Sequence, residues 1–175
     1  MTGSIVQINI SPGGIPKRPI PEADITSAGI RGDSWAHPRI HGGPNQAVLL
    51  IGVEAIEHLR SFGYPLFYGA LGENLTVSGL DRAAMRFGQR YRAGSVLLEL
   101  TKMREPCATL DEYGIGIQRL MFDKFVRDGD VDSPKWGLSG FYARVLEPGA
   151  IRVRDTITLV DHGVPSPHAS SSSVS

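Results

Sequence analysis

Residues 96–107 read VLLELTKMREPC, an apolar segment that runs into charged residues, a proline and a cysteine. A valine and three leucines in the first five positions predict a β-strand. Pro106 fixes its own φ and disfavours helical backbone at Glu105, so a stiff, extended loop is expected directly after the strand. The segment therefore predicts a sheet protein that holds Cys107 just beyond a strand end.

The other apolar segments are short and closely punctuated. The 175 residues include 21 glycines and 12 prolines, which excludes long helices over most of the chain. Helical spacing of apolar residues predicts two surface helices packed on a sheet, over 53–62 and 117–126. Strands are predicted over 4–10, 47–51, 74–77, 96–101, 140–146 and 156–160. This order is not a regular strand–helix alternation, so it favours a mostly β barrel with a few inserted helices.

The bulk composition limits the class of partner. The length predicts one domain, 1–161, followed by a serine-rich tail, 162–175, which is too polar to bury a core and is expected to be disordered. Eighteen basic and eighteen acidic residues cancel, and the basic ones are scattered, which argues against nucleic-acid binding. No apolar run approaches the roughly 20 residues of a membrane span, and no secretory signal is recognised. We therefore expect a cytoplasmic protein that does not bind a membrane.

Cys107 is the only cysteine of the chain. A single thiol cannot form an internal disulfide, and a reducing compartment keeps it functional. Arg104, three residues earlier, can favour the thiolate by its charge or bind an anionic group beside it. On the residues alone, a buried spectator cysteine is the more common case. Cys107 is thus either an inert small residue or the reactive centre.

Two further clusters are candidates for ligand contact near glycines. Lys17 and Arg18 follow a pair of glycines, and free backbone amides beside two cations suit a small anion. His41 precedes another pair of glycines, which lets the backbone approach a ligand closely. A purely structural turn, with the histidine capping a carbonyl, explains the second cluster equally well.

Two more clusters lie on predicted strands. Glu73 and Asn74 enter the strand over 74–77, where holding a loop by hydrogen bonds is favoured over contact with a ligand. On the strand over 140–146, alternation places Tyr142 and Arg144 on one face. An arginine at such a position is either paired with another side chain or directed at a ligand.

The chain resembles the MOSC domain family, named after the C-terminal part of molybdenum cofactor sulfurase. The resemblance begins with the segment 104–107 at the end of an apolar strand. No single motif is specific, but the ordered set spans nearly all of 4–161. The set comprises Gly32-Asp33, His41-Gly42-Gly43, Gly72-Glu73-Asn74-Leu75, Phe87-Gly88, Ala93-Gly94-Ser95 and the segment 140–146.

This resemblance implies a closed, mostly antiparallel β barrel of the pyruvate-kinase-barrel-like type. The small stand-alone bacterial members are the most similar in organisation. The C-terminal helical segment of some N-hydroxylaminopurine-resistance proteins is not recognised, which leaves the redox partner and the substrate open.

The resemblance also implies a cofactor and roles for named residues. Cys107 would ligate the metal of a molybdenum–pterin cofactor and carry the catalysis, a two-electron reduction of a small N-hydroxylated compound. An electron-transfer protein would then be a partner, and pyridoxal phosphate binding is a further association of the family. Lys17 and Arg18 would bind the cofactor phosphate. Arg104 and Arg144 would make further contacts with anionic groups. The pocket would be supported by His41, Glu73 and Asn74.

Three alternatives use the same residues differently. A sulfur or cofactor carrier would hold a persulfide on Cys107 without redox turnover of its own. A cysteine hydrolase would need His41 within hydrogen-bonding reach of the sulfur, and none of the local nucleophile signatures is present. In a non-catalytic β-barrel binding module, Cys107 would be an unreactive residue buried in the core.

Overall fold

A computed structural model describes residues 1–35 and 42–163. Within them, seven strands form a closed β barrel in the spatial order β1-β11-β7-β8-β9-β5-β6, because β1 pairs with both β6 and β11. The barrel strands are β1 (Thr2–Ile10), β5 (Val48–Gly52), β6 (Leu75–Ser78), β7 (Arg90–Ala93), β8 (Val96–Met103), β9 (Phe141–Glu147) and β11 (Thr156–Asp161). The mainly β, closed barrel is therefore confirmed.

One barrel pair is parallel and the others are antiparallel. β5 and β6 run in the same direction and are joined through α1 (Val53–Arg60), which contacts both strands. A parallel pair needs such a crossover, because a tight turn can only reverse the chain. The helix predicted over 53–62 is confirmed, although it ends at Arg60; Gly63, at φ +94°, lies three residues beyond this end.

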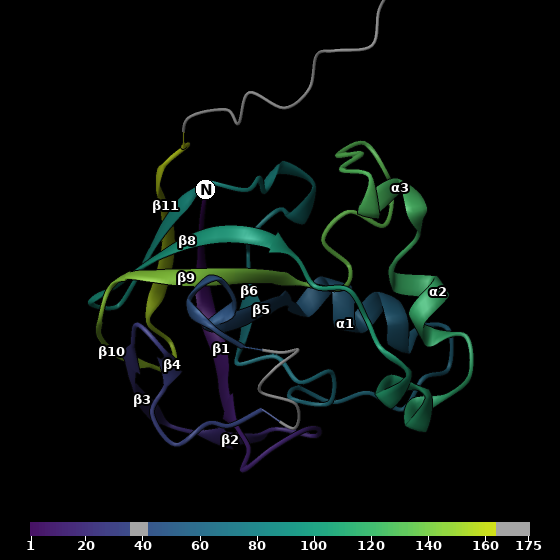
Figure 1. The fold of residues 1–175 in the computed structure, drawn as a ribbon, viewed down its shortest axis with the longest axis horizontal. Coiled ribbons are helices and arrows are strands. Elements are labelled where there is room, and N and C mark those ends of the chain that lie inside the picture. The colour runs from purple at the N-terminus through teal and green to yellow at the C-terminus, as the bar shows by residue number, and fades with distance from the viewer. Residues whose placement is uncertain (36–41, 164–175) are drawn as a thin grey trace, which may run out of the picture.

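Short strands outside the barrel add a second layer. β3 (Glu22–Thr26), β4 (Gly29–Ile30) and β10 (Gly149–Arg152) form a three-stranded sheet, and β2 (Arg18–Ile20) pairs with β1. Figure 1 shows this small sheet on one side of the barrel and the α-helices on the other. None of these four strands was predicted, and β7 was also missed; β2 and β4 have only three and two residues, too few for an alternation to register as a pattern.

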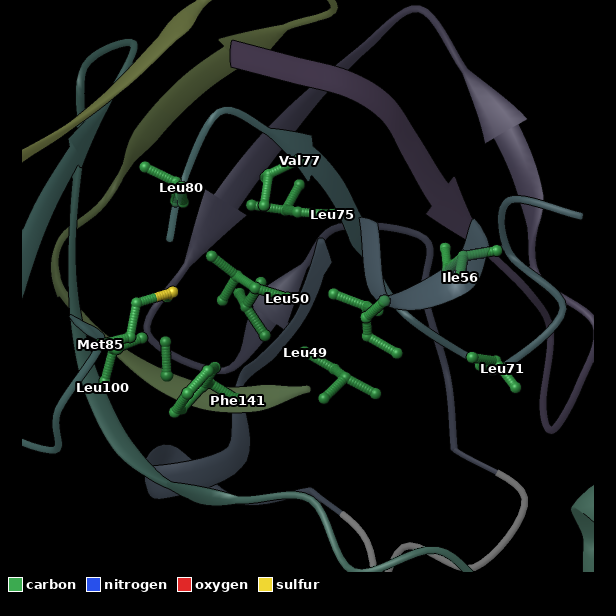
Figure 2. Close-up of a cluster of buried hydrophobic side chains, with 14 of the residues drawn as sticks. Leu49, Leu50, Ile56, Leu71, Leu75, Val77, Leu80, Met85, Leu100 and Phe141 are labelled. Atoms are coloured by element: carbon green, nitrogen blue, oxygen red, sulfur yellow. The ribbon is translucent and has the colours of Figure 1, made fainter. Parts of the chain in front are cut away.

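The core lies inside the ring of strands. Figure 2 shows Leu50, Leu75, Leu100 and Phe141 pointing toward one another from the four strands β5, β6, β8 and β9. Each of these side chains is at most 2% exposed. Phe141 and Ala143 face this core while Tyr142 and Arg144 face outward, so the alternation expected for β9 is confirmed.

The helix predicted over 117–126 is wrong in its continuity. The segment forms two short helices, α2 (Ile117–Met121) and α3 (Lys124–Arg127), separated by extended backbone at Phe122 and Asp123. The Asp123 carboxylate accepts a hydrogen bond from the Val126 N–H at 3.1 Å and so starts the second helix. Because of this break, Phe122 is buried and Phe125 is 56% exposed. The prediction of one helix had placed Phe125 on its apolar, buried face.

Three 3-10 helices complete the described elements: η1 (Pro44–Gln46), η2 (Arg82–Ala84) and η3 (Ala108–Tyr113). In the described ranges, none of the helices combines the length and the apolar content that a membrane crossing requires. The predicted domain, 1–161, stays a prediction, although the barrel draws strands from Thr2 to Asp161. Most of the predicted tail, from 164 on, lies outside the described residues, and its disorder stays a prediction.

Candidate functional site

A cleft open to solvent brings together segments that are far apart in the sequence. Its walls come from the β1–β2 connection and from the segment that follows β4. Further walls come from β5, from the loop before β6, from the end of β8 with η3, and from β9. The lining residues are Gly14, Ile15, Lys17, Ser34, Trp35, Leu49, Leu71, Gly72, Arg104, Cys107, Thr109, Leu110 and Tyr142. The site therefore joins one thiol and two cations to mostly apolar walls.

Cys107 lies on this wall and is half-buried. β8 ends at Met103, and Cys107 has extended backbone, φ −117° and ψ 170°, directly before η3. Its carbonyl accepts a hydrogen bond from the Leu110 N–H at 3.1 Å, which fixes the cysteine to the following helical turn. The sulfur lies 3.2 Å from the Thr109 hydroxyl. The thiol is thus free, accessible from the cleft and held by short-range contacts, as the strand–proline pattern predicts.

Arg104 is a buried cation that makes no salt bridge with a carboxylate in the described part of the chain. Its side chain reaches the cleft although the residue is only 7% exposed. Nη2 donates to the Leu71 carbonyl at 3.0 Å, whereas Nη1 is buried and has no hydrogen-bond partner among the described residues. Burial lowers the pKa of Arg104, while the nearby Tyr142, Cys107 and Glu73 act to raise it. An arginine stays protonated under such a shift, so a positive charge with a free N–H lies beside the thiol.

Lys17 also reaches the cleft, but its charge is compensated. Its ammonium contacts both oxygens of Asp33, at 2.5 and 2.6 Å, and both side chains are less than 10% exposed. The Asn74 amide donates to Asp33 Oδ2 at 2.8 Å, and its oxygen accepts from the Leu49 N–H at 3.1 Å. Asn74 therefore braces Asp33 and β5, and does not itself line the cleft.

Glu73 lies behind the cleft wall with no exposed surface. Its Oε1 accepts hydrogen bonds from the Gly69 N–H at 2.6 Å and from the Thr76 hydroxyl at 3.0 Å. Its Oε2 is buried without a partner. Burial raises the pKa of Glu73, against the lowering effects of those hydrogen bonds and of Arg104. The structural role that was favoured for this residue agrees with its contacts.

The remaining candidates are not brought to the cleft. Arg18 is exposed on β2, with its guanidinium 5.8 Å from the centre of the Phe67 ring. Arg144 is paired with Glu99 of β8 at 2.5 Å, and Glu99 also binds Arg90 at 2.8 Å. His41 lies outside the described residues. Of the predicted site residues, the structure thus gathers Cys107, Arg104 and Lys17 in one cleft and places Glu73 and Asn74 behind it.

Sequence reasoning missed three contributors to the site. Asp33 belongs to a recognised glycine–aspartate motif, but its partner Lys17 could not be identified from spacing. Trp35 packs its ring against Gly42, where an added Cβ would lie 2.7 Å from the indole, so only glycine fits. Thr109 follows Cys107 by two residues, and its polarity was the only signal that pointed to it.

Comparisons with known proteins identify the family to which the chain is similar. A family model described as the MOSC domain matches residues 37–158. The uncharacterized protein YflK of Bacillus subtilis (strain 168) is 30% identical over 152 residues, which are 86% of this chain and 64% of YflK. Protein YiiM of Escherichia coli (strain K12) is 31% identical over 147 residues, 79% of this chain and 59% of YiiM.

A third relative and a solved structure extend the comparison. A protein named "Reductase" from Gibberella moniliformis is 29% identical over 145 residues, 80% of this chain and 24% of that protein. The crystal structure of YiiM from Geobacillus stearothermophilus superimposes with a TM-score of 0.68 at 26% identity, covering 93% of this chain and 77% of that one. The chain spans about three fifths of the length of YflK and YiiM. Since the family model covers more than two thirds of the residues and the barrel carries Cys107 at the predicted strand end, the chain belongs to the MOSC domain family.

Proposed function

We propose that this chain binds a molybdenum–pterin cofactor through Cys107 and reduces N-hydroxylated compounds to the corresponding amines or amidines. The observation that carries the proposal is the pairing, on one cleft wall, of an accessible thiol with a buried guanidinium whose Nη1 has no hydrogen-bond partner among the described residues. MOSC domains are generally linked to the molybdenum cofactor, and one relative is named a reductase. Both facts support the proposal.

The residues of the cleft fit an anionic, sulfur-ligated group. A buried cation is costly unless an anion or hydrogen bonds compensate it, and Arg104 Nη1 has neither among the described residues. A phosphate or another anionic oxygen at this atom would supply the missing acceptor. The thiolate of Cys107 is a soft ligand of the kind that suits a metal with sulfur ligands. Charge and ligand type therefore both match.

Each lining residue then has a task that its contacts define. Cys107 offers the protein ligand, and Thr109 holds the sulfur from 3.2 Å. Arg104 binds the anionic part of the group. Lys17 adds a second N–H donor whose position is fixed by Asp33. The Lys17 Nζ is held against both carboxylate oxygens of Asp33, so it is not placed to bond an aldehyde, and the proposal does not include pyridoxal phosphate.

The bound cofactor would supply a two-electron redox centre that accepts the oxygen of the substrate. The overall reaction is R–NH–OH + 2 e⁻ + 2 H⁺ → R–NH₂ + H₂O, in which the N–O bond breaks and nitrogen is reduced. The electrons come from an external electron-transfer protein, and the protons come from groups of the protein or from water. The side chains of Trp35, Leu71 and Leu110 give the cleft an apolar surface for the non-reacting part of a substrate.

Turnover of a defined compound tests the proposal. The full chain is expressed in a host that makes the cofactor and is given benzamidoxime with reduced methyl viologen as electron donor. We expect benzamidine to form with the wild type and not with Cys107→Ser, whereas the matched surface variant Ser61→Ala, far from the cleft lining, reacts as the wild type does. Equal rates for wild type and Cys107→Ser would overturn the proposal.

The carrier alternative has a separate signature. Intact-mass measurement would then show one added sulfur on the wild-type chain, absent from Cys107→Ser, and no benzamidine would form. The half-buried, accessible thiol allows this reading as well. Added sulfur without turnover would replace the reductase with a sulfur carrier on the same residue.

A further inference from the structure

The cleft has an apolar surface that the proposed cofactor contacts do not use. The leucines that line it are at most 4% exposed. Ile15, Trp35 and Tyr142 line the same cleft and are half-buried, so most of the apolar area that a ligand can meet comes from these three. Trp35 is the largest of them and carries a flat indole ring.

Gly42 covers one face of this indole. An ideal Cβ on Gly42 would lie 2.7, 2.8 and 2.9 Å from Cδ2, Cε2 and Cε3 of Trp35, three atoms of its six-membered ring. A point that is almost equally far from three atoms of one ring, and well beyond bonding distance, lies above the face of that ring. The part of Trp35 that lines the cleft is therefore ring surface that Gly42 leaves uncovered.

The segment that carries Trp35 is anchored on the residues directly before it. The Ser34 N–H donates to the Ser11 carbonyl at 2.9 Å, and the Asp33 N–H donates to the Ile30 carbonyl at 3.1 Å. The Asp33 carboxylate in turn accepts a hydrogen bond from the Ser11 N–H at 2.8 Å. A ring that is held in place in this way loses little side-chain entropy when a ligand packs on it.

We infer that Trp35 is a specificity-determining residue: a flat, aromatic group of the substrate packs on its indole while the N-hydroxylated end reaches the Cys107 centre. Aromatic pairs contribute beyond the area that they bury, whereas a saturated ring is puckered and cannot lie flat on an indole. The cleft therefore selects aryl over alkyl N-hydroxylated compounds. This role rests on the proposed function, and it assigns the indole to the substrate and not to the planar pterin of the cofactor.

Tryptophan fluorescence tests the contact without turnover. The chain has two tryptophans, and Trp136 is only 1% exposed, so a ligand in the cleft changes the emission of Trp35. Benzamidoxime is titrated against cyclohexanecarboxamidoxime, which has the same number of carbons in a saturated ring, on the molybdenum-free full chain and on the loaded one. We expect benzamidoxime to bind about 3- to 10-fold more tightly in both, which corresponds to the contribution of an aromatic pair. The emission of Trp35→Leu should not respond, and equal binding of the two compounds would overturn the inference.

Kinetics of the loaded enzyme test the selection. With reduced methyl viologen as donor, the ratio of kcat/KM for benzamidoxime over the cyclohexyl compound should fall about 3- to 10-fold in Trp35→Leu. The change should lie in KM, at unchanged kcat and molybdenum content, because the packing is equal in the ground state and the transition state. Trp35→Phe keeps a flat ring and should retain the preference. Phe62→Leu is the matched control, since Phe62 is 59% exposed and does not line the cleft, and it should behave as the wild type does.

The two proposals fail in different ways. If the wild type reduces benzamidoxime and Trp35→Leu leaves the ratio unchanged, Trp35 only packs on Gly42, the selection is overturned and the proposed function stands. A fluorescence response of the molybdenum-free chain that disappears in the loaded one would also overturn the selection, because the pterin would then cover the indole. If the wild type contains no molybdenum and reduces nothing, the proposed function falls together with the substrate role of Trp35, although the aryl preference of the molybdenum-free chain would still be present.

Discussion

Replacing Asn74 with alanine should destabilise the protein strongly, although Asn74 does not line the cleft. The substitution removes the acceptor of the buried Leu49 N–H and the amide that donates to Asp33 at 2.8 Å. An orphaned buried N–H costs about 1–3 kcal/mol, and a lost hydrogen bond to a charged group costs about 1.5–3 kcal/mol. We therefore expect a loss of about 3–5 kcal/mol, a large part of the 5–15 kcal/mol that holds a typical domain folded.

Urea denaturation at neutral pH, followed by tryptophan fluorescence, measures this loss. The matched control is Asn45→Ala, an exposed asparagine, which should change the free energy of unfolding by less than about 0.5 kcal/mol. If Asn74→Ala costs less than about 1 kcal/mol, its hydrogen bonds are not what holds Asp33 and β5 in place, and the assignment of Asn74 as a structural brace is refuted.

Three further predictions concern burial and charge. Because folded Glu73 keeps its proton to a higher pH than an unfolded glutamate, unfolding releases a proton between the two pKa values, and stability falls by about 1.4 kcal/mol for each pH unit of rise in that window. Chemical denaturation across pH should show this slope for the wild type and lack it for Glu73→Gln. Gly140→Ala should lower Tm by several degrees in a thermal melt, because Gly140 has φ +90° and an added Cβ would lie 2.6 Å from the Leu50 carbonyl oxygen; an unchanged Tm would contradict that close contact. Arg144→Ala should leave molybdenum content unchanged in metal analysis, because its guanidinium binds Glu99 and does not reach the cleft; a metal loss would place Arg144 in the site after all.

The long elements of the fold were predictable because their side chains repeat a local pattern. Six predicted strands coincide with β1, β5, β6, β8, β9 and β11, and α1 has the predicted start. The short strands β3 and β10 depend on pairing with a distant segment, Ala23 with Ile151 for example, which no local pattern encodes. The break between α2 and α3 arises because Asp123 caps a new helix instead of continuing the old one.

The site was predictable only where covalent neighbours define it. Cys107 and Arg104 share one loop, so their proximity follows from the chain itself. The fate of the other charges depends on partners from distant segments. Asp33 neutralises Lys17 across 16 positions, and Glu99 pairs with Arg144 across 45. Whether a buried arginine finds a salt-bridge partner is therefore a property of the fold, and among the described residues Arg104 is buried without one.

The metal content of the purified chain tests the central claim most directly. The wild type and Cys107→Ser are produced side by side in a host that makes the molybdenum–pterin cofactor, purified gently, and analysed for molybdenum and for the pterin. We predict close to one molybdenum per wild-type chain and almost none in Cys107→Ser. Wild-type protein free of molybdenum, or equal molybdenum in both, would contradict a cofactor held by this sulfur.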